Sequence, residues 1–200
     1  ANIGFQTFLN SQEEIDLLEK MQFDYFRLGL VDKKIHSIEP CLRNTDIVSV
    51  DFKSVKASEL NFAHNYPNGF KSNQICTISR YAGLSSRVSS VGIFDVFDND
   101  ISYAILSQVI WYFIEGFSLR IKEDPLSKNF KGSSYHVVVD NQDLKFYKSE
   151  LSQKWWLELK KNNNNSNIKS LIPCNYQDYL DAKNEKFSER ILLSLKRNFV

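Results

Sequence analysis

The feature that most constrains this chain is an alternation of strand-like and helix-like segments over residues 1–122. Residues 46–52 are dominated by β-branched side chains, which predicts a strand of a parallel sheet with both faces buried. Residues 88–96 are a second strand candidate, and residues 72–82 and 102–122 have the apolar spacing of helices. This order favours an α/β fold with three layers (α/β/α), a mostly parallel sheet and right-handed crossovers.

The segment before the first long strand contains a shorter set of elements. Residues 2–6 are strand-like. Ser11 and Glu14 have the spacing of a capping box, and the apolar residues that follow predict an amphipathic helix that ends at Gly29. A second, shorter helix is expected around residues 34–43.

The pattern changes near residues 120–125, where the sign of the charge changes as well. Residues 1–116 contain 10 basic and 14 acidic side chains, whereas residues 117–200 contain 15 and 10. We therefore predict an α/β domain over 1–122 and a C-terminal extension over 123–200. Its expected elements are strands at 135–139, 144–147 and 155–159, a polar loop at 160–167 and helices near 176–182 and 188–197.

Composition excludes several classes of protein. The formal net charge is +1, which argues against a strongly basic nucleic-acid surface. No apolar run approaches the roughly 20 residues that cross a bilayer, and the most apolar stretch, 101–117, is expected to be a buried helix. Cys41, Cys76 and Cys174 lie far apart, which predicts small buried thiols in a reducing, cytoplasmic setting.

Two acidic residues stand where the predicted parallel strands end. Asp51 closes the first strand and Asp95 the second, and ligands of parallel sheets bind beyond these carboxyl ends. Carboxylates there can bind a hard metal ion or a cationic substrate, although each can equally cap a loop amide or face water. The loop at 53–68 is long enough to be functional, and His64 within it is either a ligand or a solvated side chain.

The remaining candidates have weaker support. His36 and His136 have no acidic or Cys partner at the spacing of a metal site. Trp155 and Trp156 could stack on a ligand, but one ring in the core and the other over an edge is the better interpretation. The sequence contains no dinucleotide-binding, P-loop, serine-hydrolase or zincin motif.

Five segments together resemble the C-terminal half of the ureohydrolases, the superfamily of arginase, agmatinase and formimidoylglutamase. These segments are 2–6 (Asn-Ile-Gly-Phe-Gln), 46–52, 67–70 (Pro-Asn-Gly-Phe), 80–83 (Arg-Tyr-Ala-Gly) and 110–117. The likeness is greatest to the arginase-like and formimidoylglutamase-like proteins of Bacteroidetes-type bacteria. It implies a three-layer α/β fold and two Mn²⁺ ions that activate water for hydrolysis of a guanidino or formimino carbon.

The resemblance also places individual residues. The family's Asp-x-Asp metal motif falls on Asp51-Phe52-Lys53, so Asp51 matches a metal ligand and Lys53 replaces the second aspartate. An ammonium cannot take the place of an anionic ligand. The family's substrate-binding acid falls on Asp95, and its Asn-Pro sequence is absent. The family's Gly-Gly-x-His and Asp-x-His-x-Asp motifs are absent from this chain as well.

Two hypotheses follow. In the first, the chain is a fragment or a degenerate member of the ureohydrolases that binds no Mn²⁺ pair, with Lys53 paired to Asp51 in place of a metal. In the second, it is a non-catalytic interaction module that keeps the fold and binds a partner through the basic, aromatic region 145–161. An open sheet edge would allow a homo-oligomer in either case. A small guanidino or formimino compound is the expected ligand only if the intact protein is active.

Overall fold

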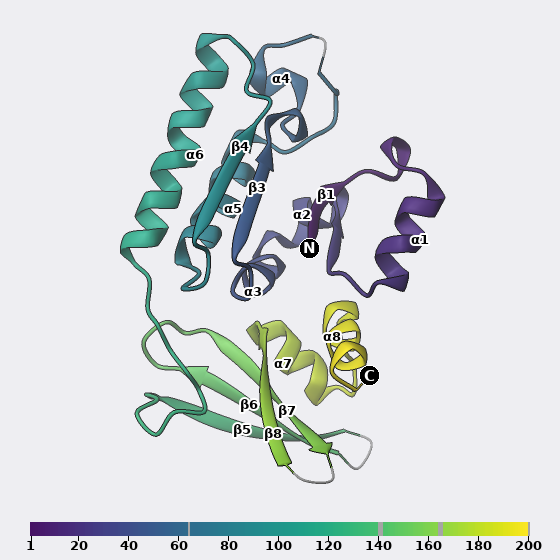
Figure 1. Cartoon of the computed structure of the whole chain (residues 1–200), viewed down its shortest axis with the longest axis vertical. Coiled ribbons are helices and arrows are strands. Elements are labelled where there is room, and N and C mark those ends of the chain that lie inside the picture. The colour runs from purple at the N-terminus through teal and green to yellow at the C-terminus, as the bar shows by residue number, and fades with distance from the viewer. Residues whose placement is uncertain (64, 140–141, 164–165, 200) are drawn as a thin grey trace. The chain divides into compact units, whose positions relative to one another are not determined.

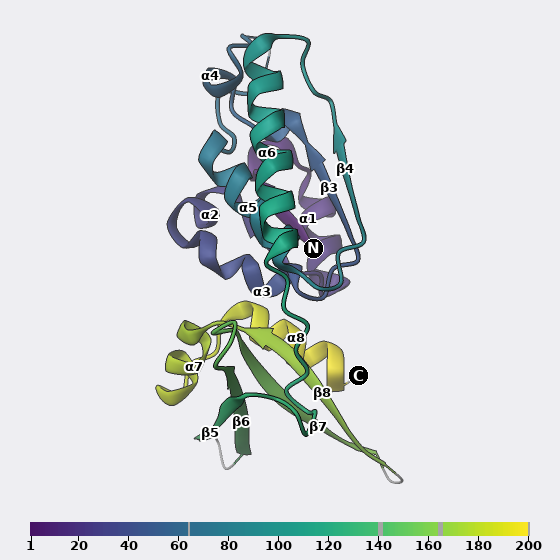
Figure 2. The same ribbon diagram turned by 90° about the vertical axis from the view of Figure 1, so that its left-hand side faces the viewer.

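A computed structural model provides the fold of this chain (Figures 1 and 2). It describes residues 1–63, 65–139, 142–163 and 166–199. The chain forms two compact units. The first unit consists of residues 1–15 and 25–120, and the second consists of residues 16–24 and 121–200.

The first unit begins with a small parallel sheet. Strand β1 (Asn2–Phe5) pairs in parallel with β2 (Tyr25–Arg27). Helix α1 (Gln12–Lys20) lies between them in the sequence, with residues 12–15 in the first unit and 16–20 in the second. Its capping box is confirmed, since the Glu14 amide donates to Ser11 Oγ (3.2 Å) and the Ser11 amide to Glu14 Oε2 (2.8 Å). The other short elements of the first unit are η1 (Thr7–Leu9), α2 (Leu28–Lys34), η2 (Ile35–Ser37) and α3 (Glu39–Leu42).

The prediction of a helix that continues to Gly29 is wrong. Helix α1 ends at Lys20, and Gln22 adopts a left-handed conformation (φ 54°) that interrupts the helix. The chain then enters β2, where Phe26 is buried. Gly29 lies inside α2 and ends no helix. Burial of the strand in tertiary packing outweighs the helical spacing of the sequence.

The second parallel pair matches the predicted strands. Strand β3 (Ile47–Asp51) pairs in parallel with β4 (Ser90–Phe94). Helices α5 (Ser72–Leu84) and α6 (Asp100–Ser118) lie alongside this pair in Figures 1 and 2. The segment expected to be a long loop contains η3 (Phe52–Ser54) and α4 (Ala57–Leu60).

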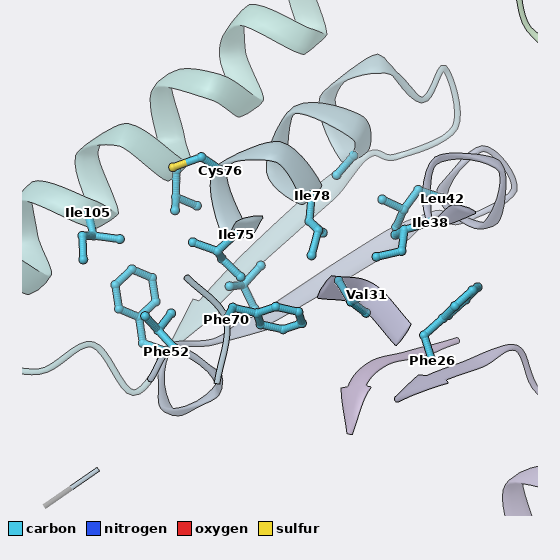
Figure 3. Close-up of a cluster of buried hydrophobic side chains, with 14 of the residues drawn as sticks. Phe26, Val31, Ile38, Leu42, Phe52, Phe70, Ile75, Cys76, Ile78 and Ile105 are labelled. Atoms are coloured by element: carbon cyan, nitrogen blue, oxygen red, sulfur yellow. The ribbon is translucent and has the colours of Figure 1, made fainter. Parts of the chain in front are cut away.

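Only one face of this β3–β4 pair is buried, which corrects the expectation of two buried faces. Val50 is buried in the core of this unit, whereas Ile47 and Phe94 are 69% and 55% exposed. The core joins this inner face to α5, α6 and the short N-terminal elements (Figure 3). Its buried members include Phe26, Val31, Ile38, Leu42, Val50, Phe52, Phe70, Ile75, Ile78, Ile105 and Val109.

Helices α5 and α6 cross closely at two glycines. A Cβ atom on Gly83 would lie 2.3 Å from the Phe113 carbonyl oxygen, and one on Gly116 would lie 2.4 Å from the Arg80 carbonyl oxygen. Gly83 lies inside α5 and allows this close crossing. The backbones approach as closely as they do because neither position has a side chain.

The second unit is an antiparallel meander with two helices. Strands β5 (Gly132–Val139), β6 (Gln142–Ser149), β7 (Trp155–Asn163) and β8 (Ser166–Cys174) pair in that order. Helices α7 (Tyr176–Lys183) and α8 (Glu189–Phe199) follow as predicted. Buried side chains of the sheet pack with Ala182 and Ile191 of the two helices.

The polar tract at 160–167 is largely strand, which corrects its prediction as a loop. Strands β7 and β8 pair from Trp155 with Cys174 as far as Asn163 with Ser166. Residues 164 and 165, the remainder of the predicted loop, lie outside the described residues. A long cross-strand register therefore overrides the low strand preference of asparagine.

The fold class is mixed α/β, with smaller sheets than expected. In the described residues, the parallel pairs β1–β2 and β3–β4 form separate two-stranded sheets. Both pairs have the parallel direction predicted for residues 1–122, but each is smaller than the predicted sheet. The largest sheet, β5–β8, is antiparallel and lies in the predicted C-terminal extension. The difference arises because the four C-terminal strands are joined in sequence as hairpins, and hairpins pair antiparallel.

Candidate functional site

The predicted site lies where β3 and β4 end. Asp51 is the last residue of β3, and it is in register with Phe94, the last residue of β4. Asp95 follows at once, so the parallel register brings the two acidic positions to the same end of the strand pair.

Lys53 links the two strand ends through different parts of the residue. Its Nζ lies 2.9 Å from Asp95 Oδ2, and its backbone amide donates to Asp51 Oδ1 at 2.7 Å. The expected ion pair to Asp51 is therefore replaced by one to Asp95. Asp51 instead caps the short helix η3.

The Lys53–Asp95 pair is open to solvent. The two side chains are 51% and 49% exposed. The hydrogen bond and charge of Asp95 raise the pKa of Lys53 above its ordinary value, with a smaller contribution from the charge of Asp51. Asp95 itself has a left-handed backbone (φ 53°), a conformation that aspartate tolerates better than most residues.

A second polar contact lies just after β4. Tyr103 of α6 donates its hydroxyl to Asp98 Oδ1 at 2.9 Å, and this bond raises the pKa of the Tyr103 hydroxyl. Asn99 caps α6 by accepting from the Ser102 amide at 2.8 Å. The acidic segment after β4 is therefore used locally, to anchor the start of α6.

These residues do not suit a pair of manganese ions. Mn²⁺ favours several oxygen ligands, and a bridged pair needs carboxylates that serve both ions. Asp51 Oδ1 already accepts the backbone amide of Lys53, and the Lys53 ammonium lies 2.9 Å from the carboxylate of Asp95. Across the described ranges, no group of three or more His, Cys, Asp or Glu side chains could hold a metal ion.

The other candidate residues are dispersed. His64 lies outside the described residues. His36 Nδ1 is 2.8 Å from the Tyr81 hydroxyl, and His136 Nδ1 is 3.0 Å from Asp143 Oδ1, in different units. The three cysteines are buried, as predicted, and burial raises the pKa of Cys76.

Trp155 and Trp156 are both buried, which limits a surface role for the aromatic region 145–161. The Trp155 ring stacks with Tyr135 and Tyr179, with centroids 5.3 and 5.0 Å apart. The Trp156 ring meets Phe130 edge-on at 6.1 Å. Both tryptophans are less than 10% exposed, so they stabilise the unit from within.

The sequence did not indicate an open hollow at the carboxyl ends of β1 and β2. Its volume is about 780 Å³, and Gln6 Nε2 spans part of its rim to donate to the Asn68 carbonyl at 3.1 Å. Strand β2 was predicted as helix, so no strand end was expected there. Basic side chains dominate the charged lining of the hollow: Arg27, Lys33, Lys56 and Lys71, with Asp32.

Comparison with known proteins gives a match in structure only. No family model and no curated protein sequence matches this chain. The formiminoglutamase of Trypanosoma cruzi, solved with Mn²⁺, matches with a TM-score of 0.53 and 17% identity over 60% of this chain and 44% of that one. The formimidoylglutamase of Bacillus subtilis matches with a TM-score of 0.53 and 20% identity over 60% and 42%. Part of this chain has an arginase-like fold.

The extent of this likeness is limited. An arginase superfamily protein from Trypanosoma cruzi also matches, with a TM-score of 0.51 and 17% identity over 60% of this chain and 44% of that one. The chain thus spans less than half the length of these proteins. At such identities the likeness concerns the fold, and activity must be argued from the site.

No helix among the described residues is long and apolar enough to span a membrane.

Proposed function

We propose that this chain is a degenerate ureohydrolase that does not hydrolyse guanidino or formimino compounds and keeps the arginase-like fold as a scaffold for interaction. The observation that carries the proposal is the Lys53–Asp95 ion pair at the ends of β3 and β4. In parallel sheets this is the position at which ligands bind.

The ion pair opposes both functions that the family resemblance assigns to these strand ends. A metal ion held by Asp51 would lie near the positive charge of Lys53, and these like charges would repel, with solvent reducing the repulsion at this half-exposed site. A cationic substrate group would compete with the Lys53 ammonium for Asp95, from which Nζ is 2.9 Å away. The ion pair therefore disfavours the binding of a metal ion at Asp51 and the binding of a cationic substrate at Asp95.

Manganese binding and turnover provide the direct test. We expect isothermal titration calorimetry with Mn²⁺ to give no saturable heat, and arginine, agmatine and formiminoglutamate to yield no urea or formamide. Lys53→Asp should lower the Mn²⁺ dissociation constant, because it replaces a cation with a carboxylate next to Asp51. Lys56→Asp changes charge equally three residues away and should have no such effect. Stoichiometric Mn²⁺ binding and turnover by the unaltered chain would refute the proposal.

A second candidate function is metal-dependent hydrolysis by a longer protein that contains this chain. It is favoured by the presence of Asp51 and Asp95 at the ends of adjacent strands, where Asp51 would be the metal ligand and Asp95 the contact to substrate. The same assays on the natural full-length gene product distinguish it. Turnover that is lost in Asp51→Asn and Asp95→Asn would favour the hydrolase over the scaffold.

A further inference from the structure

The outward side of α6 carries a stripe of exposed apolar side chains. Tyr103, Ile110, Trp111, Ile114 and Phe117 are between 43% and 58% exposed. Their spacing of three, four and seven residues places them on one face of the helix. We call this set the α6 stripe. Figures 1 and 2 show α6 as the long helix beside β4.

The opposite side of the same helix is already buried. Ile105, Val109 and Gly116 face the core and α5. Helix α6 is thus apolar on both sides, a pattern typical of a helix that is covered all round. The polar residues on this face are Ser107 and Ser118, and its charged residue, Asp100, lies at the start of the helix.

The size of the α6 stripe suits a protein interface. A large side chain that is fully accessible presents roughly 200 Å², so five side chains that are about half exposed present on the order of 500 Å². The largest apolar patch on an ordinary monomer is about 300–600 Å² and is often functional. A stable complex buries about 800 Å² on each partner, so the stripe and its rim supply an area of the required order.

The charges at the two ends of the stripe are opposite. At the start of α6, Asp98 accepts the Tyr103 hydroxyl, and Asp100 lies in the first turn. At the end, the Arg120 guanidinium lies 4.2 Å from the centre of the Phe117 ring. A second copy placed antiparallel would bring the acidic end of each stripe to the basic end of the other. A parallel copy would place like charges together.

We propose that two copies of this chain associate through their α6 stripes, with the two helices antiparallel about a twofold axis. An apolar face with an acidic and a basic end is complementary to an antiparallel copy of itself, as a twofold interface requires. The antiparallel arrangement also opposes the two helix dipoles favourably. This inference goes beyond the proposed function and does not depend on whether the strand ends bind a metal.

Sedimentation equilibrium over a concentration series tests the association. We expect a mass of twice 23.3 kDa at high concentration. The double substitution Trp111→Glu with Ile114→Glu should weaken the dimer by about 100-fold or more, because it removes central apolar contacts and introduces like charges. Phe8→Ser is the control, because Phe8 is 94% exposed and lies outside α6. This substitution should leave the dimer dissociation constant unchanged.

The geometry is tested by cross-linking. In an antiparallel pair centred on the stripe, Ile110 of one copy lies near Ile110 of the other, whereas the Ser118 residues lie at opposite ends. Ile110→Cys should therefore form a covalent dimer on mild oxidation, and Ser118→Cys should not. The native cysteines are buried and give little background. Rapid cross-linking of Ser118→Cys alone would contradict the antiparallel arrangement.

Folding of each variant is checked by its far-ultraviolet circular dichroism. If the double variant loses helix content, Ile114→Gln serves as a milder second variant and should still weaken the dimer. A chain that is monomeric at every concentration would overturn the proposal. So would a monomer whose stripe binds phospholipid vesicles, or a dimer whose constant is unaffected by both stripe variants.

Discussion

The two tryptophans of the second unit are buried, whereas the tryptophan of the first unit is exposed. In the second unit, Trp155 and Trp156 are 6% and 8% exposed, and rings from several elements surround Trp155. In the first unit, Trp111 on α6 is 58% exposed, and its ring meets that of the adjacent Tyr112 edge-on at 5.0 Å. Aromatic content alone therefore does not locate an interaction surface in this chain.

The difference follows from how each sheet is covered. The antiparallel meander packs one face on α7 and α8 and so encloses a core within its own sequence. The parallel pair β3–β4 buries one face and exposes Ile47 and Phe94 on the other. Parallel sheets are normally buried on both faces, so the first unit keeps apolar surface that the second does not.

The two tryptophans give the largest expected contrast. Trp155→Ala should destabilise the second unit by about 3–5 kcal/mol, because it removes a buried ring and leaves a cavity. Trp111→Ala should change the stability of the first unit by less than about 1 kcal/mol at concentrations where the chain is monomeric. Hydrogen exchange measured peptide by peptide assigns each change to its unit.

One result would contradict this contrast between Trp155 and Trp111. A large loss of stability from Trp111→Ala in the monomer would mean that the α6 stripe is part of a core, and the two units would then not differ in this respect. Tyr179→Phe provides a control in the second unit, because it keeps the ring that stacks on Trp155 and should cost little.

The local elements were predictable where short-range chemistry decides the structure. The Ser11–Glu14 capping box formed as its spacing indicates, and β3 and β4 formed where β-branched residues cluster. The helical spacing of residues 21–28 failed because β2 gains backbone pairing with β1, a partner more than 20 residues away in the sequence. The spacing of apolar residues within one segment does not indicate a strand partner so distant in the sequence.

The sequence predicted where the candidate site lies but not how its side chains pair. The parallel register carries Asp51 and Asp95 to neighbouring strand ends, as the alternation of elements implies. Which carboxylate Lys53 meets depends on side-chain direction and on the left-handed turn at Asp95, neither of which a sequence pattern specifies. The exposure of the α6 stripe was likewise missed, since 101–117 was expected to be a buried helix.

The crossing of α5 and α6 gives the next largest effect. Gly116→Ala should destabilise the first unit by about 1–3 kcal/mol, because the new Cβ would lie 2.4 Å from a backbone oxygen that cannot move aside. Gly29→Ala is a matched control in α2, where an added Cβ meets nothing within 4 Å and should stabilise slightly. Thermal unfolding of both variants compares them. Equal effects would show that the crossing is loosely packed.

A buried carboxylate in the second unit gives a smaller, pH-dependent effect. Burial alone would raise the pKa of Glu158, but hydrogen bonding from Tyr147 and the Lys169 ammonium hold it below its ordinary value. A depressed pKa stabilises the fold above the unfolded value near 4.5, and this contribution is lost as the pH falls through the folded pKa. Glu158→Gln should cost about 1–2 kcal/mol at neutral pH. The difference from the unaltered chain should shrink in acid when unfolding is followed by urea titration.

The exposed pair of the first unit should give the smallest effect, with the opposite pH dependence. Asp95 raises the pKa of Lys53, so the pair stabilises the fold fully below the unfolded value of 10.5 and loses this contribution as the pH rises through the folded pKa. Lys53→Met should therefore lower the urea midpoint only slightly at neutral pH, since half-exposed ion pairs contribute little, and the difference should vanish in strong alkali. A difference that instead persists at high pH would mean that the Lys53 stem contributes by packing and not by charge. The contrast between a solvent-screened pair in one unit and a buried carboxylate in the other would then no longer hold.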